Sequence, residues 1–221
     1  MTATQRIALN TAAAYGRSLF ALVLGLFSAR WVLNALGVTD FGLYGVVGSI
    51  IIFITFINTV MSGSVARFYA YAIGQGMCLC PADAVLDLRK WFNTAFSIHI
   101  ILPTLLMLVG YPIGIYAIHH WLTIPADRIQ ACVWVFRISL VTAFVNMSSV
   151  PFVAMYTAHQ LITELAFWGI VSSVCSFAGA FSLFYFQSDR LIIYALYMMG
   201  IGAGIPVLQV IRAVIKFPAC R

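Results

Sequence analysis

The sequence predicts an all-α membrane protein with six transmembrane helices, and two observations lead to this prediction. Of its 221 residues, 63% are apolar and only 8% are charged, and the mean hydropathy is +1.01. Water-soluble domains carry about 25% charged residues, so a soluble fold could not cover this many apolar side chains. The apolar residues also form runs of about 20, which is the helix length that crosses a hydrocarbon layer of about 30 Å.

Six such runs follow one another, and together they predict a single membrane domain over residues 1–221. The first two runs are separated by only a few residues, among which Gly37, Asp40 and Gly42 are typical of turns. Backbone groups must be paired while they lie in lipid, so this turn marks where the chain leaves the hydrocarbon. The predicted spans are 12–33, 41–61, 91–111, 132–155, 164–186 and 191–211.

Basic residues are unevenly divided between the two sides of this predicted bundle. Because six crossings return the chain to its starting side, both termini share one side, and the cytoplasmic side of a membrane protein is the one richer in Lys and Arg. The termini are therefore predicted to be cytoplasmic, and the net charge of +6 indicates topology rather than a nucleic-acid partner. The seven basic residues on the side of the termini are Arg6, Arg67, Arg89, Lys90, Arg212, Lys216 and Arg221, against Arg30, Arg128 and Arg190 on the other.

Small and hydroxyl residues recur at helical spacing in four of the six spans. Such stripes either allow close packing of helices in lipid or line a polar cavity, and the sequence leaves both interpretations open. Asn58 in the second span and Asn146 in the fourth lie on these stripes, so both are candidate substrate-binding residues. The stripes include Ala14, Ser18, Ala21 and Gly25; Gly45, Gly48 and Thr59; Ser139, Thr142 and Ser149; and Gly169, Ser172, Ser176 and Gly179.

Three arginines fall inside or beside the spans, where an arginine at mid-bilayer costs about 2.5–3.5 kcal/mol on insertion scales. At ~100° per residue, Arg17 lies about 60° from Ala14 and 40° from Ala21, so we expect it to face the bundle interior. Arg30 and Arg137 lie off these stripes and favour an interface, although Arg137 is kept as a candidate cavity residue. No carboxylate lies in mid-span, which favours an anionic ligand such as phosphate or pyrophosphate.

Glycines and a proline are concentrated in the sixth span, in the run GIGAGIP from Gly200 to Pro206. Both residue types weaken helix hydrogen bonding, and transporter helices often bend near a midplane binding site. The run therefore predicts a functional bend in this helix.

The five cysteines predict neither a disulfide framework nor a metal centre. Cys132 and Cys175 lie in apolar runs and are expected to be small core residues. Cys78 and Cys80 form a CxC pair without a nearby histidine or a second pair, which is a weak metal-binding pattern. No metal site and no cofactor are expected.

Several stretches together resemble one protein family. They are ALGVTDFGLYGVVGSIIIFITFINTVMSGSVARFYAYAIGQG, FNTAFSIHIILP, IPADRIQ and SVPFVAMYTAHQLITELAFWGI. In this order and spacing they are similar to bacterial polysaccharide biosynthesis membrane proteins. These are the O-antigen type, lipid-linked oligosaccharide flippases of the multidrug/oligosaccharidyl-lipid/polysaccharide exporter superfamily.

The resemblance implies one six-helix lobe of a two-lobe, MATE-like transporter in the bacterial inner membrane. Family members move an undecaprenyl-pyrophosphate-linked sugar chain between leaflets by alternating access, without covalent catalysis. On this resemblance the chain corresponds to the amino-terminal half, so its partners would be membrane lipid, the lipid-linked substrate and a second six-helix half or another copy. Arg17 corresponds best to the basic cavity residues of the family's first helix. Arg67 in VARF is either a matching element or an ordinary positive-inside anchor.

Three other functions are weighed against this one. A MATE-type antiporter of cationic drugs is disfavoured, because it would be expected to place a carboxylate in mid-span. A membrane-embedded enzyme acting on lipid-linked sugars would need a base or an acidic metal cluster near the interface, and Asp83 and Asp87 lie on the side opposite to His119 and His120. The third alternative is an inactive fragment or an assembly partner.

Overall fold

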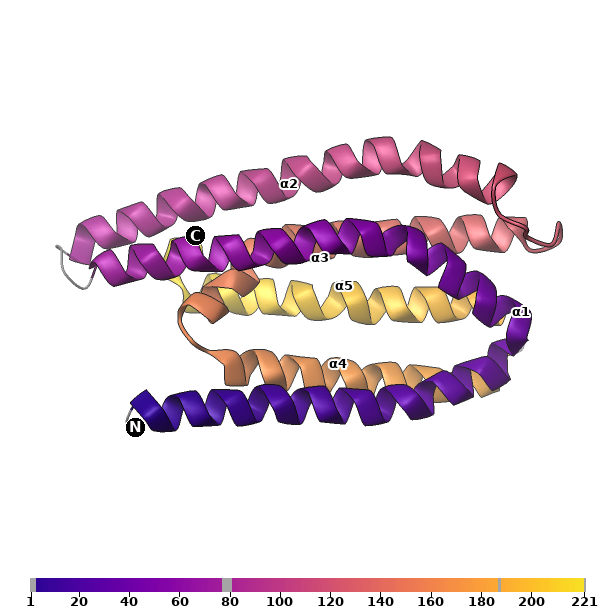
Figure 1. Ribbon diagram of the computed structural model, residues 1–221, viewed down its shortest axis with the longest axis horizontal. Coiled ribbons are helices and arrows are strands. Elements are labelled where there is room, and N and C mark those ends of the chain that lie inside the picture. The colour runs from indigo at the N-terminus through magenta and orange to yellow at the C-terminus, as the bar shows by residue number, and fades with distance from the viewer. Residues whose placement is uncertain (1–2, 77–80, 187, 221) are drawn as a thin grey trace.

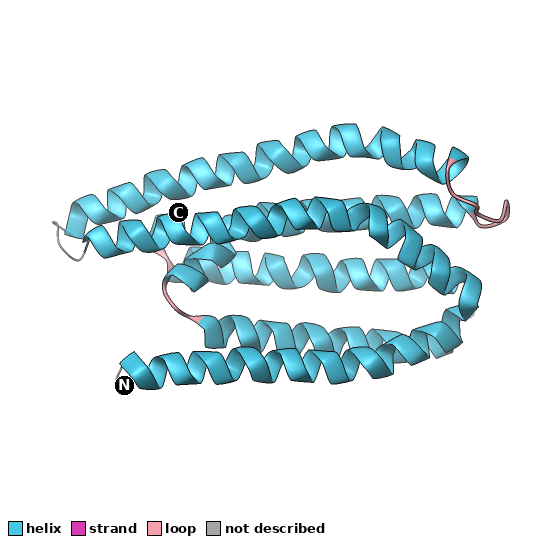
Figure 2. Ribbon diagram, in the orientation of Figure 1, coloured by secondary structure: helices cyan, strands magenta, loops and turns pink. Residues whose placement is uncertain are grey.

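The computed structural model describes residues 3–76, 81–186 and 188–220, and the chain is 92% helical, with no strand in the described part. The prediction of an all-α fold is therefore confirmed (Figure 2). The six predicted runs fall within the long helices, except that the fifth continues past the end of α4 to Phe186. The long helices are α1 (Ala3–Gly76), α2 (Pro81–His120), α3 (Ile129–Ala158), α4 (Ile162–Ser182) and α5 (Arg190–Lys216), and the short ones are η1 (Leu183–Tyr185) and η2 (Pro218–Cys220).

Helix α1 is two helices joined at one residue. Gly37 has φ 80° and ψ 168°, and it alone leaves the helical conformation between Ala3 and Gly76. A positive φ strains residues with a side chain, so glycine is the residue suited to this position. Asp40 and Gly42 do not form the turn as expected but are helical, because the single residue Gly37 suffices to reverse the chain (Figure 1).

The chain runs back and forth along one long axis, and both marked ends of the chain lie at the same end of the bundle (Figure 1). We call this the terminal end and the opposite one, which holds Gly37, the turn end. In the described part of the chain, five helical segments are long and apolar enough to cross a membrane, and the one in α1 is Ala8–Ser49. These helices indicate a multi-pass membrane protein.

Helix α3 is the centre of the bundle. In its most apolar 18-residue window, 56% of the residues are buried, against 17% in each of the other four helices. It packs against both α5 and α1 and also against α2. The outer faces of the remaining helices expose large apolar side chains such as Leu19, Leu108 and Ile215, as expected for surfaces that contact lipid.

The two ends of the bundle are held together differently. At the turn end, Arg128 lies between two carboxylates, 3.0 Å from Asp40 and 3.2 Å from Asp189. Asp40 lies in α1 just after Gly37, and Arg128 and Asp189 directly precede α3 and α5, so one guanidinium joins α1 to the starts of α3 and α5.

At the terminal end, Glu164 of α4 pairs with Arg212 and, at 2.6 Å, with Lys216, both on α5. The other helices meet there through apolar side chains, among them Tyr69, Phe92, Tyr156 and Phe217.

Candidate functional site

Two adjoining cavities lie between the halves of α1. The turn-side cavity, of about 340 Å³, is lined by the second half of α1 together with α3, α4 and α5. The terminus-side cavity, of about 280 Å³, is lined by Arg17 from the first half of α1 and by the same three helices. The cavities share Asn146, Ser172, Ile201 and Gly202, so we treat them as one groove. Figure 1 shows α5 running behind the space between the two halves of α1.

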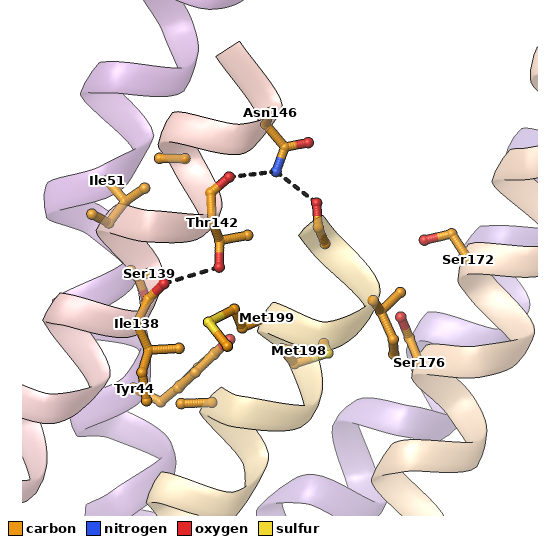
Figure 3. Close-up of a pocket in the computed structure, with 15 residues that line it drawn as sticks. Tyr44, Ile51, Ile138, Ser139, Thr142, Asn146, Ser172, Ser176, Met198 and Met199 are labelled. Atoms are coloured by element: carbon orange, nitrogen blue, oxygen red, sulfur yellow. Dashed lines mark hydrogen bonds between the residues drawn. The ribbon is translucent and has the colours of Figure 1, made fainter. Parts of the chain in front are cut away.

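The turn-side cavity carries polar side chains on two helices, α3 and α4 (Figure 3). Thr142 and Asn146 come from α3, and Ser172 and Ser176 project from α4 on the other side of α5. Apolar side chains of α1 and α5, including Met199, fill the remaining wall. The small and hydroxyl stripes of the fourth and fifth spans thus line a cavity here, which the sequence left open as one of two interpretations.

Asn146 makes the main polar contact between α3 and α5. Pro206 has no N–H, so the carbonyl oxygen of Gly202, four residues earlier, has no regular helical donor. The side-chain amide of Asn146 donates to that oxygen at 2.9 Å and also to the carbonyl oxygen of Thr142 at 2.8 Å. An unpaired carbonyl in an apolar setting is costly, so this contact stabilises α5 across its proline.

Gly202 also lets α3 and α5 approach each other closely. A Cβ atom at Gly202 would lie 2.8 Å from the methyl carbon of Thr142, which is too close for any larger residue without a shift. Helix α5 is continuous from Arg190 to Lys216, so the glycine and proline run does not interrupt it, and the functional bend stays a prediction. The run provides the close approach to Thr142 and the carbonyl oxygen of Gly202 to which Asn146 donates.

Arg17 points from α1 toward α4 and into the groove. Its side chain lies over Gly169, where a Cβ atom would be 3.1 Å from both Cγ and Nε of the arginine. Of the described residues that line the two cavities, Arg17 is the only charged one. None of the side chains that the structure describes forms an ion pair with its guanidinium.

Trp168 and Gln209 complete the polar lining around Arg17. The indole Nε1 of Trp168 is buried and has no hydrogen-bond acceptor in the described part of the chain. An indole N–H can only donate, as can a guanidinium. The terminus-side cavity therefore combines a positive charge with a neighbouring indole N–H that has no described acceptor, which suits an anionic ligand.

The other candidate residues are not brought into this lining. Asn58 is partly buried and its Oδ1 has no donor among the described groups, but it does not line either cavity. Arg137 lies on the exposed side of α3, with its Nε donating to the hydroxyl of Tyr111 at 3.2 Å. Arg30 is exposed on α1.

His99 lies in a different place from the groove. Its ring is 1% exposed, and Nδ1 is 2.8 Å from the carbonyl oxygen of Ala95. It lines an apolar cavity of about 260 Å³ between α1 and α2 that shares no lining residue with the groove.

In the described part of the chain, no three His, Cys, Asp or Glu side chains lie close enough together to hold a metal ion. Cys132, Cys175 and Cys220 are free thiols. Cys78 and Cys80 lie outside the described residues.

Sequence reasoning missed Trp168, Gln209 and the bond between Asn146 and Gly202. A signal for that bond was present, because a proline at 206 leaves the carbonyl at 202 without its donor. Its partner could not be found, since 56 residues separate Asn146 from Gly202. Trp168 and Gln209 carried no pattern that distinguishes a groove residue from a packed or interfacial one.

The chain matches no family model, no curated protein and no solved structure in the three comparisons. The resemblance to polysaccharide flippases therefore depends on the sequence stretches quoted above, and function has to be argued from the groove.

Proposed function

We propose that this chain forms one lobe of a flippase for lipid-linked oligosaccharides and that its groove holds the pyrophosphate headgroup. The observation that carries the proposal is Arg17, a guanidinium without an ion-pair partner among the described side chains, in a groove whose described lining includes no carboxylate. A guanidinium presents several donors in a fixed plane that matches phosphate oxygens. The resemblance to the flippase family agrees with such a ligand.

In this mechanism the charged headgroup lies between the two halves of α1 while the polyprenyl tail stays in lipid. Arg17 binds the phosphate oxygens, and the indole N–H of Trp168 donates a second hydrogen bond. Hydroxyl groups of Ser172 and Ser176 extend the polar surface toward the turn end, where sugar hydroxyls would lie. A second lobe, from another copy or a separate chain, would close the groove and allow alternating access.

The orientation proposed for this lobe places the terminal end in the cytoplasm of a bacterial inner membrane. Seven basic residues belong to that side of the chain and three to the other. The headgroup would then enter at the terminal end, where Arg17 lies closer to the opening than the serines do. Labelling of single cysteines placed at Gln5 and at Thr123 in intact cells tests this orientation.

The direct test is binding of undecaprenyl pyrophosphate to the purified protein in detergent. We expect Arg17→Ala to weaken binding by about 10- to 100-fold, since a hydrogen-bonded charge contact contributes about 1.5–3 kcal/mol. Arg17→Lys should lose less, because it keeps the charge without the planar fork. Arg30→Ala is the matched control, an exposed arginine on the same helix that does not line the groove.

Equal affinity of the wild type and Arg17→Ala would reject the headgroup site. Tight binding of a lipophilic cation at the groove would instead favour a drug antiporter, although its lining offers no carboxylate. If neither ligand binds, the chain is an assembly partner or an inactive lobe.

A further inference from the structure

Arg137 occupies the face of α3 that points away from the groove. At ~100° per residue it lies about 180° from Asn146, so the two side chains leave the helix on opposite sides. Its neighbours on that face are exposed, with Trp134 at 45% and Val141 at 48%. In a membrane protein this face contacts lipid. The guanidinium of Arg137 therefore lies beside hydrocarbon, where a charge is energetically costly.

The guanidinium of Arg137 is held in a fixed position by two aromatic residues. Its Nε donates to the hydroxyl of Tyr111 on α2 at 3.2 Å. Its Cζ lies 5.4 Å from the ring centroid of Trp134 and 5.9 Å from that of Tyr111, which are cation–π distances. Neither Nη atom donates to any side chain or carbonyl in the described part of the chain, so the outer fork of the guanidinium is free.

The depth of Arg137 places this fork near the edge of the hydrocarbon. Helix α3 has 30 residues, or about 45 Å at ~1.5 Å per residue, against a hydrocarbon layer of about 30 Å. Arg137 is eight residues from the helix start at Ile129, about 12 Å along the axis. If α3 is centred in the bilayer, the Cα of Arg137 lies roughly 5 Å inside the hydrocarbon edge, and the long side chain reaches outward to the headgroups.

Aromatic residues follow Tyr111 along the chain toward the turn end. Tyr116 and Trp121 of the α2 end are 54% and 70% exposed, and Trp and Tyr are enriched where membrane helices cross the headgroup layer. Deeper on α2, Leu108 is 76% exposed and offers an apolar surface for an acyl chain. The face therefore provides an anion-binding fork at headgroup depth above an apolar surface.

We propose that Arg137, fixed by Tyr111 and Trp134, binds the phosphate of a phospholipid in the leaflet at the turn end. The free Nη atoms match two phosphate oxygens, as guanidinium groups commonly do. A phospholipid fits better than a soluble anion because its acyl chains cover the exposed apolar residues beside the site. This site is separate from the groove and does not depend on the proposed transport function.

The test is retention of phosphatidylglycerol by the purified protein, measured by native mass spectrometry after controlled delipidation. We expect Arg137→Ala to lower the occupancy of the tightest bound lipid about tenfold. Tyr111→Phe keeps the ring but removes the hydroxyl that holds Nε, so it should lower occupancy less. Arg30→Ala is the matched control, an exposed arginine without a cation–π contact among the described residues, and it should retain wild-type occupancy.

Two results would overturn the proposal. One is wild-type retention of phosphatidylglycerol by Arg137→Ala. The other is that millimolar inorganic phosphate displaces the lipid from the wild type and from Arg137→Ala to the same extent. That result would mean that the guanidinium does not hold the headgroup. Arg137→Gln serves as a second variant if the alanine variant does not fold, because it keeps the polar stem without the charge, and the same loss is expected for it.

Discussion

The two ends of the bundle use charged residues in different ways. At the turn end, the Asp40 side chain is only 7% exposed and Arg128 is 34% exposed, so their pair is largely removed from solvent. At the terminal end, Glu164 is 15% exposed, but its partners Arg212 and Lys216 are 59% and 37% exposed. The turn-end cluster of Asp40, Arg128 and Asp189 also joins α1 to the starts of α3 and α5, whereas the terminal-end pairs join only α4 to α5.

This difference indicates which end opens more easily. Separating the helices at the turn end would leave Asp40 as a buried charge without its partner, which is strongly unfavourable. Separating them at the terminal end exposes cations that are already in contact with solvent, and what is lost there is mainly apolar contact. A conformational change that opens the terminal end therefore costs less than one that opens the turn end.

The largest effect is expected from Arg128→Ala, which breaks the turn-end cluster. It leaves the buried carboxylate of Asp40 unpaired, and we expect the free energy of unfolding to fall by about 3 kcal/mol. Thermal unfolding of the purified protein in detergent measures this. Asp189→Asn is the control, since it keeps the pair with Asp40 and an N-cap for α5, and its loss should be much smaller. Equal losses for the two variants would show that Asp40 is not the critical partner.

The next largest effect lies between the two ends, at Asn146. Asn146→Ala removes the donor to the carbonyl oxygen of Gly202, and we expect a loss of about 2 kcal/mol for an unsatisfied buried acceptor. Pro206→Ala restores a backbone N–H to the same carbonyl, so Asn146→Ala should cost clearly less in that background. A double-mutant cycle of unfolding free energies gives this coupling. Strict additivity would mean that Asn146 does not act by replacing the donor that proline lacks.

A smaller effect is expected from pH at the terminal end, where Cys220 is 7% exposed among apolar side chains. Burial raises the pKa of its thiol from 9.0 to about 12. Above pH 9 the unfolded thiol loses its proton while the folded one keeps it, so stability falls as pH rises. Between pH 8 and pH 10 the wild type should lose about 1 kcal/mol more than Cys220→Ala. Identical pH profiles of the two proteins would contradict this.

The smallest effect is expected from Arg212→Ala. Lys216 still pairs with Glu164 in this variant, and the arginine side chain is mostly exposed. Its unfolding temperature should be indistinguishable from wild type. A loss as large as that of Arg128→Ala would remove the contrast between the two ends.

The sequence predicted the helical fold and the direction of Arg17 because both depend on local periodicity. Apolar runs of span length gave the helices, and the phase of Arg17 relative to Ala14 and Ala21 gave the inward direction, which agrees with its contact to Gly169. Whether Arg17 binds substrate remains a prediction. Periodicity could also show that Asn146 lies on a polar face.

What could not be predicted depends on how separate helices align. Arg128 has an acid, Asp127, beside it in the sequence, yet in the structure it joins Asp40 and Asp189, which lie far from it in the chain. The donor for Gly202 depends on the vertical register of α3 against α5, and no local pattern fixes that register. The effect of the glycines in the sixth span likewise depends on which neighbour faces them, and that neighbour is Thr142.

Gly37 is a point at which a small backbone rotation would move the whole first half of α1. The first half of α1, Ala3 to Leu36, is a rod of 34 residues, or about 50 Å at ~1.5 Å per residue, attached through one glycine. A backbone rotation of only about 5° there would displace the far tip by roughly 4 Å, carrying Arg17 with it in proportion to its distance from the pivot. A small torsional change at one peptide could thus widen or narrow the space between the two rods by the size of a water molecule or more.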